Sequence, residues 1–222
     1  MLIISIEGNI GSGKSTLVNS LKNEVKTISH NGEVYPIIYI DEPVKVWNGI
    51  RDKDGKGIIE KYYEDQQRYA FQFQMMAYIT RLTDLRKAAA MYNGKCVLIT
   101  ERSIETDRQV FAKMLYEQSI MDNISYNIYL KWFDELSMSL KVEHTVYVKT
   151  RPETAMERIL KRQRPGETMS LDYLYKCNEM HERWLSGKDN VLTLDGEPEF
   201  NGSFETKKTK IIEMITSIIH RA

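Results

Sequence analysis

Eight residues near the start of the chain have the types and spacing needed to bind a phosphate group. The stretch Gly8-Asn9-Ile10-Gly11-Ser12-Gly13-Lys14-Ser15 fits the pattern G-x-x-x-x-G-K-[ST]. Its glycines permit a tight turn, so that successive backbone N–H groups and the start of a helix converge on an anion. Lys14 can reach the outer phosphates, and the Ser15 hydroxyl can hold Mg²⁺. We therefore expect residues 8–15, extended by Thr16, to form a phosphate-binding loop.

Two acidic residues and an arginine follow apolar segments further along the chain. Glu42 precedes Pro43, which turns the chain away from the preceding segment, and Glu101 stands next to Arg102. One carboxylate can take the proton from an attacking hydroxyl while the other holds Mg²⁺. The arginine can stabilise charge on a transferred phosphoryl group. The alternative is a pair of surface acids neutralised by arginine.

A long helical segment carries polar residues on one face. Tyr63, Gln74, Ala77 and Arg81 are spaced by eleven, three and four residues, which places them near one side of a helix. Gln74 donates and accepts hydrogen bonds at once, as the edge of a nucleic-acid base requires. The alternative is an amphipathic helix whose polar side chains are only solvated. Asp107 and Phe111 are likewise one helical turn apart.

Three arginines occur close together in the second half of the chain. Arg158, Arg162 and Arg164 precede Pro165-Gly166, so residues from about 158 to 168 are predicted to form a short arginine lid. A guanidinium group can bind phosphate oxygens through two parallel N–H···O hydrogen bonds, and its plane can stack on a nucleic-acid base. The alternative is a solvated helix end, where arginine is favoured by the helix dipole.

Alternating apolar and helical segments position these residues. Five strand-like runs are predicted, at Leu2–Ile6, Ile37–Ile40, Cys96–Thr100, Thr145–Val148 and Val191–Leu194. Helices are predicted at Ser15–Glu24, Tyr62–Tyr92, Ile104–Glu117, Asn123–Leu140, Pro152–Lys161, Leu171–Leu185 and Lys207–Ile219, and residues 49–57 are the most loop-like insertion. This alternation indicates an α/β fold with a five-stranded parallel sheet and helices on both faces. Ligands in such sheets bind beyond the carboxyl ends of the strands.

Composition limits the possible functions. The chain has 222 residues, of which 42% are hydrophobic, and this suits one domain over residues 1–222. Thirty-one basic residues balance thirty-one acidic ones, so we expect no nucleic-acid or membrane partner. The cysteines, Cys96 and Cys177, lack metal-ligand spacing and suit a reducing compartment. Since Met1 runs directly into an apolar segment and no run is long enough to span a bilayer, we expect a cytoplasmic protein.

Taken together, the motifs resemble those of deoxyribonucleoside kinases of the deoxycytidine, deoxyguanosine and mitochondrial thymidine kinase type. The resemblance covers nearly the whole chain and rests on these segments: EGNIGSGKST, Glu42-Pro43-Val44 with Trp47, Phe73-Gln74 with Arg81, Glu101-Arg102-Ser103 with Asp107 and Phe111, the three lid arginines, and Leu192-Thr193-Leu194-Asp195. It implies a P-loop kinase fold, ATP and Mg²⁺ as cofactors, a deoxynucleoside as substrate and a homodimer. The activity implied is transfer of the ATP γ-phosphate to the 5′-hydroxyl, in nucleotide salvage.

The resemblance assigns a role to each candidate residue. Glu42 would be the base for the 5′-hydroxyl, Arg102 would contact the moving phosphoryl group with Lys14, and Glu101 would hold Mg²⁺ with Ser15. ATP would be bound by the phosphate loop and by Arg158, Arg162, Arg164, Asp195 and Phe200. The deoxynucleoside would be bound by Ile10, Glu42, Trp47, Tyr63, Phe73, Gln74, Ala77, Arg81, Arg102, Asp107, Phe111 and Glu167.

The implied roles also predict a break in the long helix. Tyr63 would meet the sugar 3′-hydroxyl, as would Glu167, while Gln74 meets the base. Eleven residues of unbroken helix rise ~16 Å, which exceeds the length of a nucleoside. The polar stretch at residues 64–67 is the expected position of the break. The family usually has a proline there, which this chain lacks.

Several questions of substrate and partner stay open at this point. Ala77, Arg81 and Asp107 favour deoxycytidine or purine deoxynucleosides over thymidine, since the family's thymidine-preferring members lack this combination. The alternatives are a broad-specificity kinase that accepts thymidine, a nucleoside monophosphate kinase, and a non-enzymatic ATP-binding switch protein. For the homodimer, apolar surface is expected from Met114, Leu115, Tyr129, Trp132 and Phe133.

Overall fold

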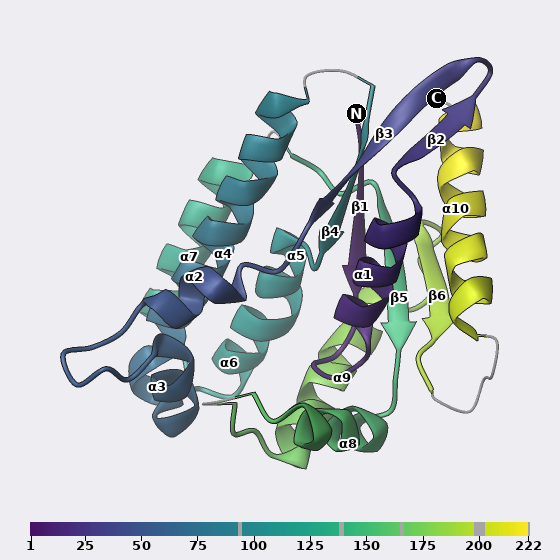
Figure 1. Ribbon diagram of the computed structural model, residues 1–222. Helices are drawn as coiled ribbons and strands as arrows, with labels where there is room; N and C mark the ends of the chain where they lie inside the picture. Colours follow the sequence, from purple (N-terminus) through teal and green to yellow (C-terminus); the bar gives the residue numbers. More distant parts are fainter. Residues whose placement is uncertain (93–94, 138–139, 165–166, 198–202, 222) are drawn as a thin grey trace.

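A single twisted sheet forms the centre of the protein (Figure 1). The computed structural model describes residues 1–92, 95–137, 140–164, 167–197 and 203–221. Within these residues the sheet has six strands in the order β2-β3-β4-β1-β5-β6. They are β1 (Leu2–Glu7), β2 (Thr27–His30), β3 (Glu33–Ile40), β4 (Val97–Glu101), β5 (His144–Lys149) and β6 (Val191–Asp195).

The prediction of a five-stranded, fully parallel sheet is wrong in one respect. Five strands run parallel, but β2 is an additional strand that pairs antiparallel with β3 at the sheet edge. Asn31 and Gly32 join the two strands and both have positive φ, 49° and 77°. Asn-Gly between strand-like segments is a strong signal for a two-residue hairpin, because both residues tolerate this conformation. That signal was present in the sequence and was missed.

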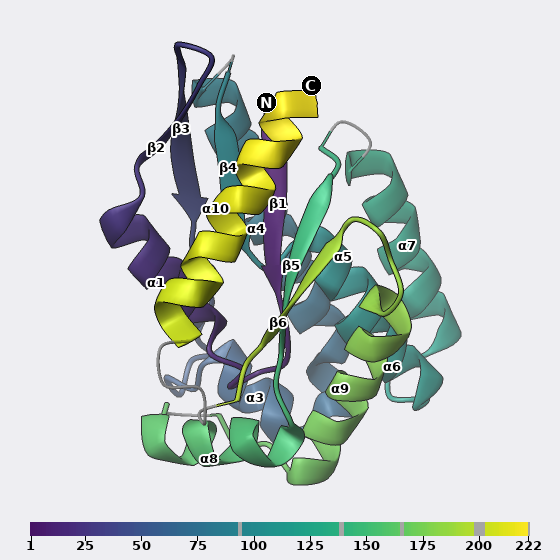
Figure 2. The ribbon, with the colours of Figure 1, turned by 90° about the vertical axis from the view of Figure 1, so that its right-hand side faces the viewer.

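Helices cover both faces of the sheet, as predicted. One face is covered by α1 (Lys14–Glu24) and α10 (Ser203–Arg221), which lie side by side in Figure 2. On the other face lie α4 (Gln66–Met91) and α7 (Asn123–Ser137). Strand β1 serves both layers, because alternate side chains point to opposite faces. Ile4 packs in the cluster that contains Leu17 and Ile211, whereas Ile3 packs in the cluster that contains Tyr78 and Phe133.

The remaining helices lie or begin near the carboxyl ends of the strands, and α9 runs from there back along the sheet (Figures 1 and 2). They are α2 (Val44–Gly49), α3 (Ile58–Glu64), α5 (Ile104–Thr106), the π-helical η1 (Asp107–Ala112), α6 (Lys113–Glu117), α8 (Pro152–Arg162) and α9 (Leu171–Leu185). The predicted helix at Ile104–Glu117 is therefore continuous but contains a π-helical segment. Helix α2 was not predicted, and Leu140, the predicted last residue of the helix that contains α7, is not helical.

The predicted break in the long helix is confirmed. Helix α3 ends at Glu64 and α4 begins at Gln66, with Asp65 between them at φ −146° and ψ 83°. The Asp65 side chain accepts a hydrogen bond from the backbone N–H of Arg68 at 3.1 Å and so caps the second helix. An N-capping aspartate therefore separates the two helices, and no proline is needed for the break.

The apolar surface expected for a dimer is mostly interior. Met114, Leu115, Tyr129 and Phe133 are buried in the cores of this chain, and only Trp132 is exposed. Exposed apolar side chains on α7 are instead Ile124, Ile128 and Trp132, which recur every four residues along one face. Among the described residues, no helix combines the length and apolar composition needed to cross a bilayer.

Candidate active site

A cavity of about 990 Å³ opens where the parallel strands end. Most of the predicted site residues line it, and they come from the phosphate loop, the ends of β3 and β4, α2, α3, α4, η1 and α8. They are Ile10, Gly11, Ser12, Gly13, Lys14, Ser15, Thr16, Glu42, Trp47, Tyr63, Phe73, Gln74, Ala77, Arg81, Glu101, Arg102, Asp107, Phe111, Arg158, Arg162, Arg164 and Glu167. Gly8, Asn9 and Asp195 are not in contact with the cavity, and Phe200 lies outside the described residues.

The phosphate loop is packed tightly against neighbouring elements. A Cβ atom at Gly8, where φ is 145°, would lie only 2.6 Å from the Val148 carbonyl oxygen. One at Gly11 would collide with the backbone of Ala155 in α8. Asn9 is buried, and its side-chain amide donates to the carbonyl oxygen of Leu174 in α9 at 2.9 Å. Asn9 therefore anchors the loop from behind the cavity.

Lys14 extends back over the loop. Its Nζ donates to the Asn9 carbonyl oxygen at 2.7 Å and lies 3.3 Å from Ser12 Oγ. Burial, together with the positive charge of Arg102, lowers the pKa of Lys14 to about 7. A phosphate group brought into the loop would favour the protonated form, since an opposite charge at close range stabilises an ammonium ion.

Ser15 and Glu101 meet at the base of the loop. Ser15 Oγ donates to Glu101 Oε1 at 2.6 Å, although the residues lie 86 positions apart in the chain. Both offer oxygen atoms, which Mg²⁺ prefers. No group of three or more histidine, cysteine or acidic residues is arranged to hold a metal ion in the part of the chain that the structure describes. This donor set fits a Mg²⁺ ion that is held by few protein ligands together with nucleotide phosphates.

Glu42 lies between two arginines. Its Oε1 accepts from Arg102 NH1 at 2.7 Å and from Arg81 NH2 at 3.2 Å. Burial raises the pKa of the Glu42 carboxyl, but the positive charges of Arg102, Arg81 and Lys14 outweigh this effect and lower the pKa to about 2. The carboxylate is therefore ionised at neutral pH and can accept a hydrogen bond from a substrate hydroxyl.

Arg81 forms a buried ion pair with Asp107. Arg81 Nε donates to Asp107 Oδ2 at 3.1 Å, and NH1 donates to the backbone oxygen of Glu101 at 3.0 Å. Burial raises the pKa of Asp107 to about 6, against the opposing effect of Arg81. The hydrogen bond from Arg81 favours the ionised carboxylate, and the pair presents fixed donors and acceptors to the cavity.

Aromatic side chains form one wall of the cavity. The rings of Trp47 and Phe73 meet edge to face with centroids 5.7 Å apart, and Tyr62 stacks on Phe73 at 4.7 Å. Gln74 projects into this region and is buried, yet its Oε1 has no hydrogen-bond partner among the described residues. A buried acceptor without a partner is costly, so a ligand that donates a hydrogen bond there would be stabilised.

The lid arginines contact backbone and acidic groups. Arg158 donates to the carbonyl oxygens of Ser12 at 3.1 Å and Gly196 at 2.7 Å. Both other lid arginines pair with Glu167: Arg162 NH2 lies 2.5 Å from Glu167 Oε2, and Arg164 NH1 lies 3.7 Å from Glu167 Oε1. Glu167 therefore neutralises two arginines that line the cavity.

Sequence reasoning missed several residues of the cavity. Tyr173 in the first turn of α9 lines it, and the Tyr173 hydroxyl lies 3.1 Å from that of Tyr62. Phe204 and Lys207 in α10 line the side near Arg158. A helix-forming pattern gives no indication that a single tyrosine or lysine faces a site. Only the packing of α9 and α10 against the strand ends shows this.

The geometry supports transfer of a phosphoryl group to a hydroxyl. A phosphate-binding loop, a pair of Mg²⁺-type oxygen ligands and an ionised carboxylate flanked by arginines face one cavity. Its aromatic wall and the unpartnered amide oxygen suit a planar, hydrogen-bonding group such as a nucleic-acid base. Catalysis of this reaction depends mainly on positioning and on electrostatic stabilisation.

Comparison with known proteins identifies the relationship. The family model "Deoxynucleoside kinase" matches residues 4–220. Human deoxycytidine kinase is 33% identical over 97% of this chain and 91% of its own length, and mouse deoxycytidine kinase is 33% identical over the same shares. Mitochondrial deoxyguanosine kinase of Xenopus laevis is 28% identical over 86% of this chain and 76% of its own length. The chain belongs to the deoxynucleoside kinase family, whose members are transferases with the P-loop kinase fold.

Proposed function

We propose that this protein transfers the γ-phosphate of ATP to the 5′-hydroxyl of a deoxynucleoside, preferring deoxycytidine or purine deoxynucleosides over thymidine. The observation that carries the proposal is the position of Glu42. Its carboxylate is ionised, held by Arg102 and Arg81, and faces the same cavity as Lys14 of the phosphate loop. That arrangement fits a hydroxyl acceptor in the nucleoside region and a phosphate donor in the loop.

The proposed roles follow from these contacts. Glu42 accepts the hydrogen bond of the 5′-hydroxyl and takes its proton as the new P–O bond forms. Arg102 then binds the transferred phosphoryl group, and Lys14 binds the donor phosphates. Mg²⁺, held by Ser15 and Glu101, would neutralise phosphate charge when bound. Arg158, Arg162 and Arg164 line the same cavity and would bind the donor phosphates.

The proposed preference for cytosine or a purine base over thymine rests on the Arg81–Asp107 ion pair. An ionised Asp107 is an acceptor that suits the amino group of cytosine or adenine. The 4-oxo oxygen of thymine would instead face the Asp107 carboxylate oxygen, and two acceptors cannot form a hydrogen bond. The 5-methyl group of thymine would also crowd Arg81. Guanine presents an oxo group where adenine has an amino group, so deoxyguanosine ranks lower. Gln74 completes the base contacts from α4.

We also propose a homodimer, supported by the family's dimeric state and by the exposed stripe of Ile124, Ile128 and Trp132 on α7. These three side chains replace the mostly buried set expected from the sequence. A stripe at intervals of four residues can pack against the same helix of a second copy around a two-fold axis.

One experiment separates the proposed activity from its rivals. The protein is incubated with MgATP and, separately, each of the four deoxynucleosides and deoxycytidine monophosphate, and products are resolved by chromatography. Formation of deoxynucleoside monophosphates, fastest from deoxycytidine or deoxyadenosine, is expected. Phosphorylation of the monophosphate alone would assign a nucleoside monophosphate kinase, and no product from any acceptor would favour an ATP-binding switch. If thymidine is phosphorylated as efficiently as deoxycytidine and deoxyadenosine, the proposed kinase activity stands but the proposed base preference is wrong.

A further inference from the structure

Glu7 is a buried carboxylate that the proposed reaction does not use. It ends β1, is fully buried and is not in contact with the cavity. Its Oε1 accepts from the backbone N–H of Ser103 at 2.9 Å, and its Oε2 accepts from the Thr106 hydroxyl. Both partners follow β4 closely, Ser103 in the turn after the strand and Thr106 in α5. A buried carboxylate requires such partners, and in return it fixes the position of the groups that donate to it.

The turn held by Glu7 contains Arg102 in an unusual conformation. The φ angle of Arg102 is 61°, in the left-handed region that residues with a Cβ atom rarely adopt. Its N–H donates to the Ile6 carbonyl oxygen at 3.0 Å, and its carbonyl oxygen accepts from the Thr100 hydroxyl at 2.6 Å. The next N–H, that of Ser103, is the one that Glu7 accepts. The conformation of Arg102 is therefore fixed by hydrogen bonds on both sides.

This conformation decides where the guanidinium group lies. Arg102 NH1 reaches Glu42 at 2.7 Å, and the guanidinium carbon lies 5.2 Å from the ring centroid of Phe111. The Ser103 N–H also lies 3.3 Å from Thr106 Oγ1, which Glu7 holds in turn, so loss of the Glu7 carboxylate releases both groups. The turn would then relax toward ordinary backbone angles, which would move the guanidinium. A displacement of about 1 Å at a catalytic group can lower the rate about 10²-fold.

We propose that Glu7 is a positioning residue, which fixes the backbone of Arg102 through Ser103 and Thr106 and thereby holds the guanidinium in place for phosphoryl transfer. The inference rests on the role proposed for Arg102. Glu7 itself contacts neither the nucleoside nor the phosphate donor. Its loss is therefore expected to lower kcat more than it changes either KM.

A double-mutant cycle tests this coupling. Glu7→Gln, Arg102→Lys and the double variant are compared with wild type in steady-state assays with the preferred deoxynucleoside and MgATP. Glu7→Gln is expected to lower kcat at least tenfold, with both KM values within about threefold of wild type. In the Arg102→Lys background, Glu7→Gln is expected to change kcat by less than about twofold. If Glu7→Gln lowers kcat by the same factor in the wild-type and the Arg102→Lys backgrounds, the effect is generally structural and the inference is overturned.

Further variants distinguish positioning from destabilisation. Ser5→Ala is a matched control, because Ser5 is buried in the same strand and its hydroxyl lies 3.1 Å from that of Thr145. It should lower the melting temperature without changing kcat. Should Glu7→Gln not fold, Thr106→Val tests the same link, and Thr106→Ser should restore kcat to within threefold of wild type. If the kcat of Thr106→Ser is no higher than that of Thr106→Val, the inference is overturned.

The outcomes also separate this inference from the proposed function. If Arg102→Lys alone leaves kcat unchanged, the role of Arg102 is wrong, and the role of Glu7 is wrong with it. If Arg102→Lys lowers kcat but Glu7→Gln does not, only the positioning role is overturned.

Discussion

Glu42 Oε1 lies 2.7 Å from Arg102 NH1, although sixty residues separate them in the chain. The parallel pairing of β3 with β4 brings them together, because each residue follows the end of its strand. The contact keeps Glu42 ionised and holds Arg102 near the hydroxyl that Glu42 would deprotonate.

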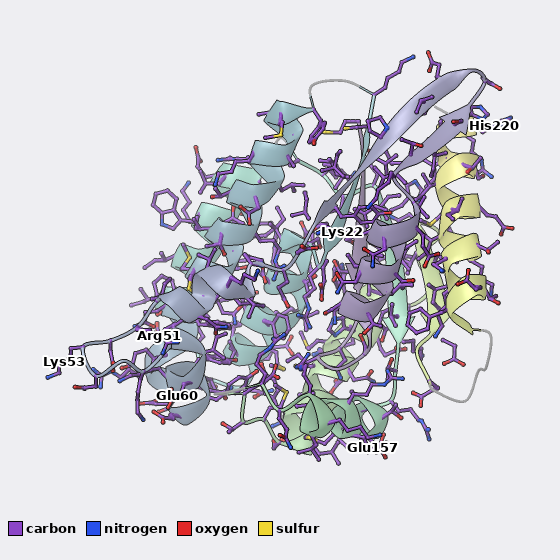
Figure 3. The ribbon with its side chains drawn as sticks, in the orientation of Figure 1. Lys22, Arg51, Lys53, Glu60, Glu157 and His220 are labelled. Carbon is purple, nitrogen blue, oxygen red and sulfur yellow. The ribbon has the colours of Figure 1, made fainter. Side chains whose placement is uncertain are left out.

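Glu42→Gln is expected to lower kcat by about 10²–10⁴, with deoxynucleoside binding changed much less. Glutamine keeps the shape of the side chain but cannot accept a proton. Asp41→Asn is the matched control, because Asp41 is exposed and its carboxylate pairs with Lys22 of α1, which is labelled in Figure 3. Near-normal turnover of Glu42→Gln at saturating substrate would place the base elsewhere, with Glu101 the first candidate.

Nucleotide binding is expected to take up a proton above pH 7. The pKa of Lys14 is about 7, so above that pH Lys14 is mostly neutral in the free protein, and a bound phosphate favours its protonated form. Titration calorimetry of MgADP at pH 8, in buffers of different ionisation enthalpy, measures this uptake. Affinity for MgADP should fall as the pH rises through 7. Lys14→Gln should show no uptake, and an uptake of zero in wild type contradicts the prediction.

Arg81→Met combined with Asp107→Ala is expected to admit thymidine. The double variant removes the ion pair as a unit and leaves no buried charge without a partner. Arg81→Met alone leaves Asp107 buried without its cationic partner, and Asp107→Ala alone leaves Arg81 with only Glu42 and the Glu101 carbonyl oxygen, so each should be less stable and less active than the double variant. The kcat/KM ratio of thymidine to deoxycytidine is the measurement. A ratio unchanged in the double variant would mean that another part of the cavity reads the base.

Arg162→Ala is expected to lower kcat by about 10² or more, since arginines that bind a transferred phosphoryl group contribute effects of 10³–10⁵ in related chemistry. Arg51→Ala serves as the control, because Arg51 is exposed in the loop between α2 and α3, far from α8 (Figure 3). A loss of similar size in both variants would argue against a specific role for the lid.

Trp132→Glu is expected to convert a homodimer into a monomer. The substitution places a charge in the exposed stripe of α7, where a second copy would bury it. Sedimentation velocity at micromolar concentration measures the mass. Leu160→Glu is the control, because Leu160 is also highly exposed but lies on α8. Wild-type protein that sediments as a monomer would rule out the dimer at that concentration.

The sequence by itself predicted the elements with strong local signals. The phosphate loop follows from fixed residue spacing, and five parallel strands follow from short β-branched runs. The helix break near residue 65 followed from the dimensions of a nucleoside. Strand β2 was missed although Asn31-Gly32 marks its hairpin, because Thr27–His30 alternates too briefly to stand out as a strand.

Only the tertiary structure decided which side chains meet and which are buried. Tyr129 and Phe133 were expected on a dimer surface with Trp132, yet α7 turns them into the core beside Tyr78 and leaves Trp132 exposed. Tyr173 faces the cavity because of how α9 packs. Glu7 adjoins the phosphate loop in sequence, but its role depends on Ser103 and Thr106, almost one hundred residues later. Local spacing determines an element and its chemistry, whereas contacts between distant segments depend on strand order and helix rotation, which no local pattern encodes.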